Sequence, residues 1–336
     1  MRGASIILSL LLLAFGPCSA QESRRAQRDE LSRQAAAEAE MKERVNASTV
    51  GFAAGLLEGA PIRFASDIGR VVNSGQAVHV LPVVTRGPTE NVNDLLYLRG
   101  IDIAIINSDS LDEYRAQVPQ IGQRIVQILN LFPSELHVFV RPEISSLADL
   151  AGKKVNFNTQ GTAAAYSGPL IFSRLGIEPE RIFEPHPVAI EKLRKGEIAA
   201  VVFVTSKPVD AFAKQKWPEG FKFLAVEHGS RLADYYVPAS LEASDYPALI
   251  KPDQHIATIA VPTVLASFNW KPGTAGYGRV SRFVDELLGK LDTLRSPGFD
   301  PRWKDVDVTA AAPGLKRFAR AQEWIEHRPT MRSQLP

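Results

Sequence analysis

Hydrophobic and polar residues alternate in short stretches from residue 48 onward, and the spacing of the apolar positions changes between two periods. Apolar stretches at residues 49–53, 78–84 and 101–106 predict buried strands. Between them, apolar positions recur at helical spacing over about residues 61–73 and 90–98. This order of strands and helices predicts a parallel sheet with helices on both of its faces.

The same alternation starts again after residue 136. Two stretches of helical spacing end at Leu175 and Lys195, and each is followed by a glycine, which commonly terminates a helix. Three further apolar stretches predict strands that these helices connect. The predicted strands lie at residues 137–141, 154–158 and 199–204. A second α/β unit is therefore expected.

The C-terminal part of the chain predicts one more strand at residues 256–261 and two helices. Apolar residues from Val280 to Leu291 recur at the spacing of a strongly amphipathic helix, and a last helix is predicted over about 315–326. We expect these helices to pack on the first unit. The predicted fold is therefore α/β with two lobes, each a central sheet flanked by helices, and a cleft between the lobes. Lobe 1 is predicted to comprise residues 48–136 and 255–336, and lobe 2 residues 137–254.

The first 20 residues have the layout of a signal peptide. Arg2 precedes an apolar run from Ile6 to Phe15, and small residues lead to a cleavage site after Ala20. The run is shorter than a membrane-spanning helix requires. We therefore predict export to the periplasm. An uncleaved anchor and a lipid attached to Cys18 are the alternatives.

Residues 21–47 are rich in alanine and in charged residues. Glu38 is spaced to pair with Lys42, and Glu40 with Arg44, on the surface of a helix. The apolar residues of this segment do not form a continuous face. We predict a charged, solvated helical extension, and a helix that binds a partner is the alternative.

Composition and motifs exclude several classes of function. The formal net charge is +2 with no basic block, which argues against a nucleic-acid-binding protein. Cys18 is the only cysteine, so a cysteine hydrolase or a zinc–thiolate site is not expected. The six histidines are scattered, and the sequence motifs of serine hydrolases, phosphate-binding loops and zinc proteases do not occur. We predict no enzymatic activity, no metal and no cofactor.

Five predicted strands end in small polar loops that lead into helices. Backbone N–H groups at helix N-termini accept carboxylates or phosphates, and loops at the carboxyl ends of strands are where α/β sheets bind ligands. Ordinary turn and capping roles are the alternative for each loop. The predicted ligand-binding residues are Ala54, Gly55, Thr85, Arg86, Gly87, Asn107, Ser108, Thr159, Gln160, Gly161, Thr162, Ala163, Thr205, Ser206 and Lys207.

Charged and capping residues beside these strands have simple expected roles. Arg86 and Lys207 directly follow predicted strands, and each is expected to pair with an anionic ligand; a solvated surface charge is the alternative. Ser108 is predicted to cap the helix that follows it. Asp102 and Asp109 are interpreted as turn or capping residues.

Several stretches, taken in their order and spacing, resemble the TAXI family of solute receptors that serve TRAP transporters. The resemblance spans roughly residues 48–270. Ala53 to Gly59 departs from the glycine-rich loop of the family, and Glu58 in this loop would oppose an anion. The stretches that carry the resemblance are residues 85–91, 100–109, 147–155, 160–162, 193–200, 203–205 and 235–239.

The resemblance implies a type II periplasmic-binding-protein fold that closes on its ligand like a Venus flytrap. It also implies a small anionic ligand, such as an amino acid or a dicarboxylate, and delivery of this ligand to TRAP-type membrane transporter subunits. We expect a monomer. A ligand-sensing protein that serves a membrane sensor, and an exported enzyme on the same scaffold, are the alternative functions.

Overall fold

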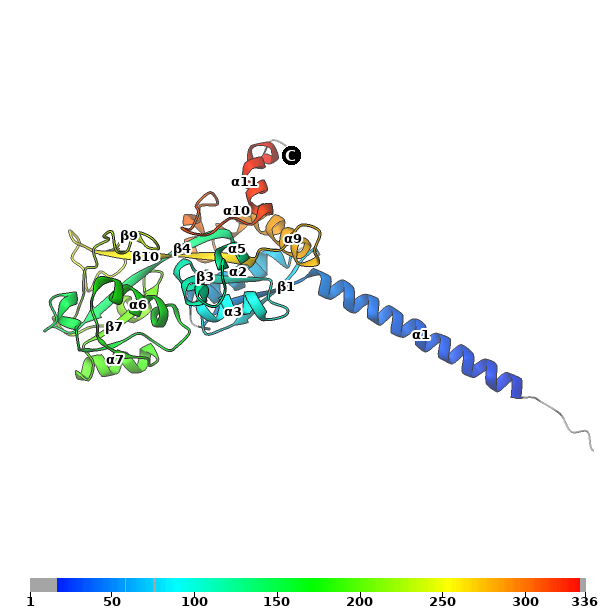
Figure 1. Ribbon diagram of the computed structural model, residues 1–336, viewed down its shortest axis with the longest axis horizontal. Helices are drawn as coiled ribbons and strands as arrows, with labels where there is room; N and C mark the ends of the chain where they lie inside the picture. Colours follow the sequence, from blue (N-terminus) through cyan, green and yellow to red (C-terminus); the bar gives the residue numbers. More distant parts are fainter. Residues whose placement is uncertain (1–16, 58, 75–76, 333–336) are drawn as a thin grey trace, which may run out of the picture. The chain divides into compact units, whose positions relative to one another are not determined.

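The computed structural model describes residues 17–57, 59–74 and 77–332 (Figure 1). Helix α1 (Pro17–Ser48) belongs to a unit of its own, and the residues from Ser48 onward form a second compact unit. Within α1, Lys42 Nζ lies 2.5 Å from Glu38 Oε1, as the spacing predicted. Most of the predicted signal peptide, residues 1–16, lies outside the described residues. Among the helices that are described, none combines the length and the apolar character needed to cross a membrane.

A ten-stranded sheet runs through the unit that begins at Ser48. Its strand order is β2-β1-β3-β10-β4-β7-β5-β6, and β8 and β9 pair with β4 and β10, respectively. β1 pairs in parallel with β2 and β3, and β5 pairs in parallel with β6 and β7, which confirms the two predicted parallel units. The strands are β1 (Thr49–Gly55), β2 (His79–Val84), β3 (Ile103–Asn107), β4 (Ile125–Val140), β5 (Lys154–Asn156), β6 (Glu180–Ile182), β7 (Ala200–Thr205), β8 (Lys222–Phe223), β9 (Val237–Glu242) and β10 (His255–Phe268).

The helices begin and end largely at the signals that the sequence carries. Pro61 lies in the first turn of α2, Ser146 forms a capping box with Asp149 before η2, and Gly176 ends α6 at a φ of 75°. The α-helices that follow α1 are α2 (Ala60–Val72), α3 (Pro88–Tyr97), α4 (Asp112–Arg115), α5 (Ile121–Arg124), α6 (Ala163–Leu175), α7 (His186–Lys195), α8 (Asp210–Ala213), α9 (Ala275–Gly289), α10 (Leu291–Leu294) and α11 (Ala319–Arg332). The 3-10 helices are η1 (Ser108–Leu111), η2 (Leu147–Leu150) and η3 (Pro301–Asp305).

Two long antiparallel strands, β4 and β10, run through both halves of this unit (Figure 1). The sequence predicted only the parts at residues 137–141 and 256–261, although the strands extend over 16 and 14 residues. Near the middle of this pair, the hydroxyls of Ser134 and Thr263 lie 2.8 Å apart and are buried. The two lobes are therefore joined by a continuous pair of strands.

Separate hydrophobic clusters define the two lobes. In lobe 1, α2 and α9 cover one face of β1 and β3, and α3 covers the other face. In lobe 2, α6 and α7 pack on opposite faces of β7. β4 passes from the core of lobe 1 into the core of lobe 2 between Phe132 and Leu136. β10 passes back from lobe 2 into lobe 1 between Val261 and Val264. Residues 256–261 therefore contribute to the core of lobe 2, whereas the sequence-based division assigned residues 255–336 to lobe 1.

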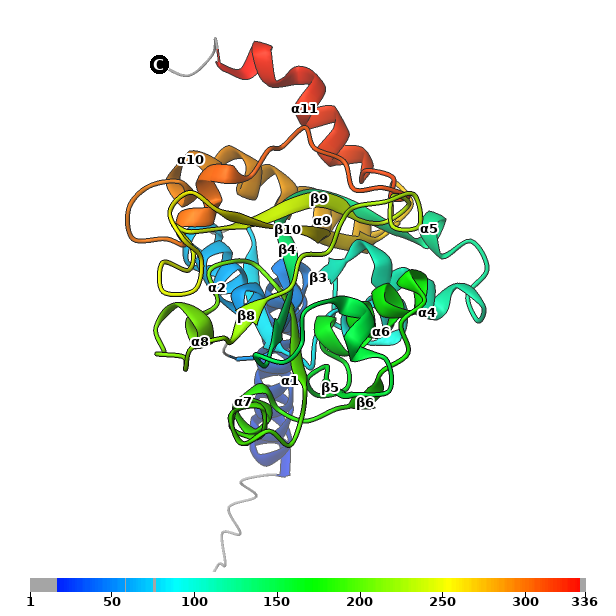
Figure 2. The ribbon, with the colours of Figure 1, turned by 90° about the vertical axis from the view of Figure 1, so that its left-hand side faces the viewer.

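The C-terminal helices pack on lobe 1, as expected, but with different bounds. The predicted continuous helix through Leu291 is α9 followed by the separate helix α10, and both bury apolar residues against α2. Figure 2 shows α9, α10 and α11 grouped on one side of β4 and β10. The last helix starts later than predicted, because residues near Arg317 run in an extended bridge beside Gln127 of β4.

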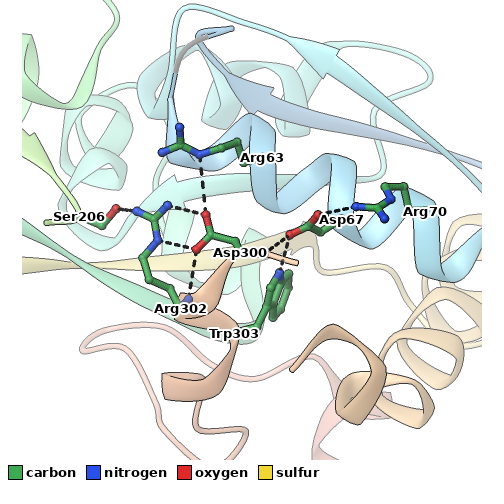
Figure 3. A network of polar contacts seen from close by, with 7 residues as sticks. All are labelled: Arg63, Asp67, Arg70, Ser206, Asp300, Arg302 and Trp303. Carbon is green, nitrogen blue, oxygen red and sulfur yellow. Dashed lines mark hydrogen bonds and ion pairs between the residues drawn. The ribbon is translucent and has the colours of Figure 1, made fainter. Parts of the chain in front are cut away.

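η3 anchors the C-terminal segment to lobe 1 through a buried tryptophan. The ring of Trp303 lies 4.4 Å from that of Phe64 in α2, and its Nε1 donates to Asp67 Oδ2 at 3.1 Å (Figure 3). The backbone N–H of Asp300 donates to the same Asp67 oxygen at 2.9 Å. These contacts fix the position of Arg302, which lies between Asp300 and Trp303.

Candidate functional site

The carboxyl ends of the parallel strands in lobe 1 face the corresponding strand ends in lobe 2, and the loops touch. Thr89 Oγ1 in α3 donates to the carbonyl oxygen of Gly161, which precedes α6, at 3.3 Å. A Cβ atom on Gly87 would lie 2.7 Å from the same oxygen, and a Cβ on Gly161 would lie 2.9 Å from Arg86 Cβ. Glycine is therefore required at this contact for the lobes to approach so closely.

A cluster of buried polar side chains lies beside this contact. Asn107, Ser108 and Asp109 come from the end of β3 and the start of η1, and Ser167 comes from α6 in lobe 2; none is more than 4% exposed. Each has one atom without a hydrogen-bond partner in the structure: Asn107 Nδ2, Ser108 Oγ, Asp109 Oδ1 and Ser167 Oγ. Because buried polar atoms are nearly always hydrogen-bonded, this cluster is a candidate place for a bound molecule or ordered water that supplies the partners.

Asp109 is the charged member of this cluster. Tyr236 of lobe 2 donates a hydrogen bond from its hydroxyl to Asp109 Oδ2 at 3.2 Å. Complete burial raises the pKa of Asp109 to about 6, although Ser167 and Tyr236 lower it in part. The Ser167 hydroxyl thus lies close to the carboxylate without forming a hydrogen bond of normal geometry. None of the ion pairs among the described residues includes Asp109, so its charge at neutral pH has no cationic partner there.

Asn91 holds the strand ends of lobe 1 in place. Its buried Nδ2 donates to the carbonyl oxygens of Ala54 at 2.8 Å and Ile105 at 2.6 Å. Thr85 Oγ1 in turn donates to Asn91 Oδ1 at 2.6 Å. One amide therefore connects the ends of β1, β2 and β3. Asn91 belongs to a stretch that carries the resemblance to TAXI receptors, but sequence reasoning did not assign it a role.

The two cations expected to meet an anionic ligand already have carboxylate partners. Arg86 Nε lies 3.3 Å from Glu90 Oε2, and Lys207 Nζ lies 2.8 Å from Asp245 Oδ2. Lys207 also donates from its backbone N–H to the buried carboxylate of Glu135 at 3.1 Å. Burial raises the pKa of Glu135 to about 7, and Lys207 lowers it in part. In this structure neither cation is left unpaired for a ligand.

The other predicted site residues have mixed roles. Thr162 is the N-cap of α6 and accepts the backbone N–H of Ala165, and its hydroxyl donates to Thr159 O. Gly55 O accepts the backbone N–H of Thr85 at 3.1 Å. The prediction that Ser108 caps the next helix is wrong, because Ser108 is the first residue of η1 and its hydroxyl caps nothing. Gln160 is exposed, Thr205 is half-buried at the end of β7, and Ala163 begins α6.

A further polar contact between the lobes involves a residue that sequence reasoning missed. Arg302 of η3 donates from Nη1 to Ser206 Oγ in the loop after β7 (Figure 3). Its Nε donates to Asp300 Oδ1 at 2.7 Å, and its guanidinium lies 5.7 Å from the ring centre of Phe132. The lobes are thus tied together at two places, near Asp109 and near Ser206. No pattern around Arg302 in the sequence distinguishes it from a surface arginine.

Comparison with known proteins gives one family match. A family model described as the NMT1-like family matches residues 63–277, a range that covers both lobes. A comparison with curated proteins found no match. Among solved structures, an ancestral arginine-binding protein bound to arginine is 15% identical, with 77% of this chain and 96% of that chain covered and a TM-score of 0.43. The periplasmic VFT2 domain of BvgS from Bordetella pertussis is 14% identical, with 80% and 98% covered and a TM-score of 0.41.

A third solved structure, that of the LysR family transcriptional regulator CbnR, is 18% identical, with 82% of this chain and 83% of that chain covered and a TM-score of 0.38. At such low identities and TM-scores, these likenesses carry no argument about what the chain binds. The family match differs from them, because residues 63–277 are well over half of the chain's 336 residues. The chain therefore belongs to the NMT1-like family.

Proposed function

We propose that this protein is an exported solute receptor that binds a small molecule where its two lobes meet and delivers it to a TRAP-type membrane transporter. The observation that supports binding at this place is the cluster of unpartnered, buried polar atoms at Asn107, Ser108, Asp109 and Ser167, to which both lobes contribute. A ligand that contacts both lobes stabilises the closed arrangement, because only the closed form offers all of its contacts.

The proposed ligand is amino-acid-like, with a carboxylate and an ammonium group. Asn107 Nδ2 is an unused donor, and the N-terminus of α6 begins beside Gly161, where backbone N–H groups favour an anion. Asp109 offers a carboxylate that has no cationic partner among the described residues, and its Oδ1 accepts no hydrogen bond, which favours a cationic group. A simple dicarboxylate would satisfy only the donors and would leave Asp109 beside a like charge. The ammonium group is therefore the feature that we expect to decide selectivity.

The binding proposal is tested by a thermal-shift screen of amino acids, dicarboxylates and amines with the full exported chain. We expect amino acids to raise the melting temperature in a saturable way, since a ligand that binds only the folded state stabilises it. The same screen on Asp109→Asn should show no shift. If no compound shifts the wild-type protein, or if both proteins respond equally, binding at this cluster is disproved. Delivery to a transporter is tested separately, by uptake of the identified solute in cells with and without this protein.

Adding a methyl group to Gly161 should weaken ligand binding in addition to destabilising the protein. The new Cβ would press against Arg86 Cβ across the lobe contact, so the closed form would become less populated and the apparent affinity would fall by about tenfold. Gly100 is a matched control, because its φ of 91° is close to the 90° of Gly161 and a Cβ there meets no atom within 4 Å.

Both variants, Gly161→Ala and Gly100→Ala, should lose about 1–2 kcal/mol of folding free energy from the left-handed backbone. Urea unfolding measures this loss, and calorimetric titration with the solute from the screen measures the affinity. Equal affinities in the two variants would show that the contact between Arg86 and Gly161 does not belong to the ligand-bound form.

A further inference from the structure

A hollow of about 420 Å³ lies on lobe 1 at the end opposite the lobe contact. It is formed by residues 95–102, at the end of α3 and before β3, together with Arg124, Phe268, Trp270 and Arg279. None of these residues belongs to the cluster around Asp109. Its volume is in the range that small-molecule sites occupy.

The charges in this hollow do not balance. Arg279 holds the buried carboxylate of Asp102 with two nitrogens, Nη2 at 2.7 Å and Nε at 3.2 Å from Oδ1, so this pair is neutral. Arg99 and Arg124 also line the hollow, and neither has an acidic partner among the residues that the structure describes. The guanidinium of Arg124 lies 5.7 Å from the ring centre of Phe268. The hollow therefore carries an excess of positive charge next to an aromatic wall.

Trp270 adds a hydrogen-bond donor that has no acceptor. Its Nε1 is buried and unpartnered, while its ring lies 5.0 Å from the ring of Phe268. Within the described chain, Trp217 and Trp303 differ in this respect, because their Nε1 atoms donate to Ala211 O and to Asp67 Oδ2. This unused donor belongs to a residue that lines the same hollow as the two arginines, so a molecule bound there would supply the missing acceptor.

The walls of the hollow are held rigidly. Asn269 donates from its backbone N–H to Arg124 O at 2.7 Å and from Nδ2 to Gln123 O at 2.9 Å. Gly276, in the first turn of α9, permits the close approach of Trp270, because a Cβ there would lie 2.4 Å from the indole ring. The backbone of Arg124 and the indole of Trp270 are thus fixed in position before any ligand arrives, which lowers the entropic cost of binding.

We infer that this hollow is a second binding site, independent of the proposed receptor site, for a small aromatic carboxylate. The carboxylate accepts hydrogen bonds from Arg124 and from Trp270 Nε1, and Arg99 adds positive charge at the rim. The ring of the ligand packs against Phe268 and the leucines at the end of α3. A planar apolar group next to a carboxylate matches this combination of aromatic wall and unpaired donors.

The inference is tested by following the indole N–H signals of the full chain in ¹H–¹⁵N spectra while phenylacetate is added. The sequence has 4 tryptophans, and Trp270→Phe identifies the signal of Trp270 by its loss. We expect this signal to shift downfield and to saturate at millimolar concentration or below. The signals of Trp217 and Trp303, whose donors are occupied, should not move and serve as internal references.

Two variants decide whether the arginine acts as proposed. Arg124→Gln should weaken phenylacetate binding by about tenfold or more, as expected for loss of a charged hydrogen bond. Arg194→Gln is the control, because Arg194 lies over Trp217 at 4.1 Å in lobe 2. This variant should bind phenylacetate with the affinity of the wild type. An immobile Trp270 signal at about 10 mM phenylacetate, well above a millimolar dissociation constant, would overturn the inference. Equal affinity in both variants, or an equal response to acetate, which lacks the ring, would overturn it as well.

Discussion

Replacing Asp109 with asparagine should make the unliganded protein more stable at neutral pH while abolishing its ligand binding. In the folded protein, burial raises the pKa of Asp109 from 3.8 to about 6. The folded state thus favours the protonated form, and the stability gained from this proton is complete below pH 3.8 and is lost as the pH rises through 6. A pKa difference of this size corresponds to about 3 kcal/mol of unfolding free energy. Asparagine keeps the shape, accepts the hydrogen bond of Tyr236 and avoids the buried charge.

The measurement is urea unfolding at a series of pH values without added solute. As the pH rises from about 4 to 6.5, the free energy of unfolding of the wild type should fall relative to that of Asp109→Asn. The variant lacks this pH dependence because it has no carboxyl group at residue 109. Asp253→Asn is the control, because Asp253 is exposed and should leave the pH dependence unchanged. If Asp109→Asn is less stable than the wild type at pH 7.5, the carboxylate has a partner that the structure does not contain.

The gain in stability and the loss of ligand binding in Asp109→Asn, taken together, test whether Asp109 serves a binding site. A substitution that raises stability and removes binding shows that the native residue costs folding free energy in order to serve a site. A purely structural Asp109 would give the opposite result, since the neutral amide of asparagine accepts a weaker hydrogen bond from Tyr236 than the carboxylate does. The protein would then be less stable, and its ligand affinity would be unchanged. The pH dependence of binding has the same origin: below about pH 6, protonation of Asp109 removes the charge that an ammonium group needs.

The alternation of strands and helices was predictable because each lobe is built from parallel units whose local patterns are strong. For β4 and β10, the two strands that run through both lobes, only the part in lobe 2 was predicted. β4 contains Asn130 and Pro133, and β10 contains Pro262, so the apolar run is interrupted at the place where each strand passes between lobes. A proline removes a backbone donor, and it normally argues against a central strand. Here Pro133 and Pro262 lie opposite each other in the register of β4 and β10.

The candidate site was predictable only in outline. The strand-end loops were found, because helix N-termini and strand ends carry local signals, and Asn107 and Ser108 lie in the buried cluster. Asp109 was interpreted as a turn or capping residue, since its burial depends on Tyr236 more than 100 residues away. Ser167 lies in the middle of a helix, where no local pattern marks a binding residue. The pairing of Lys207 with Asp245 could not be predicted either, because the two residues lie in segments that are distant in the sequence.

Replacing Asn91 with leucine should cause a large loss of stability and a loss of ligand binding. Leucine fills a similar volume, but it leaves the carbonyl oxygens of Ala54 and Ile105 and the hydroxyl of Thr85 without their partner. Each unsatisfied buried group costs about 1–3 kcal/mol, so the total should be about 3 kcal/mol or more. Urea unfolding measures the loss. Asn93→Leu is the matched control, because Asn93 lies on the exposed side of the same helix and should change stability little.

A second variant shows whether the hydrogen bonds, rather than the volume, carry this effect. Asn91→Asp has the same shape, but its carboxylate would face the oxygens of Ala54 and Ile105 without a proton to donate. Burial should raise the pKa of the new carboxyl, so protonation restores one donor and stability should increase as the pH falls. Asn91→Leu has no such group and should show the pH dependence of the wild type. If both variants respond to pH alike, the amide of Asn91 does not hold the strand ends together.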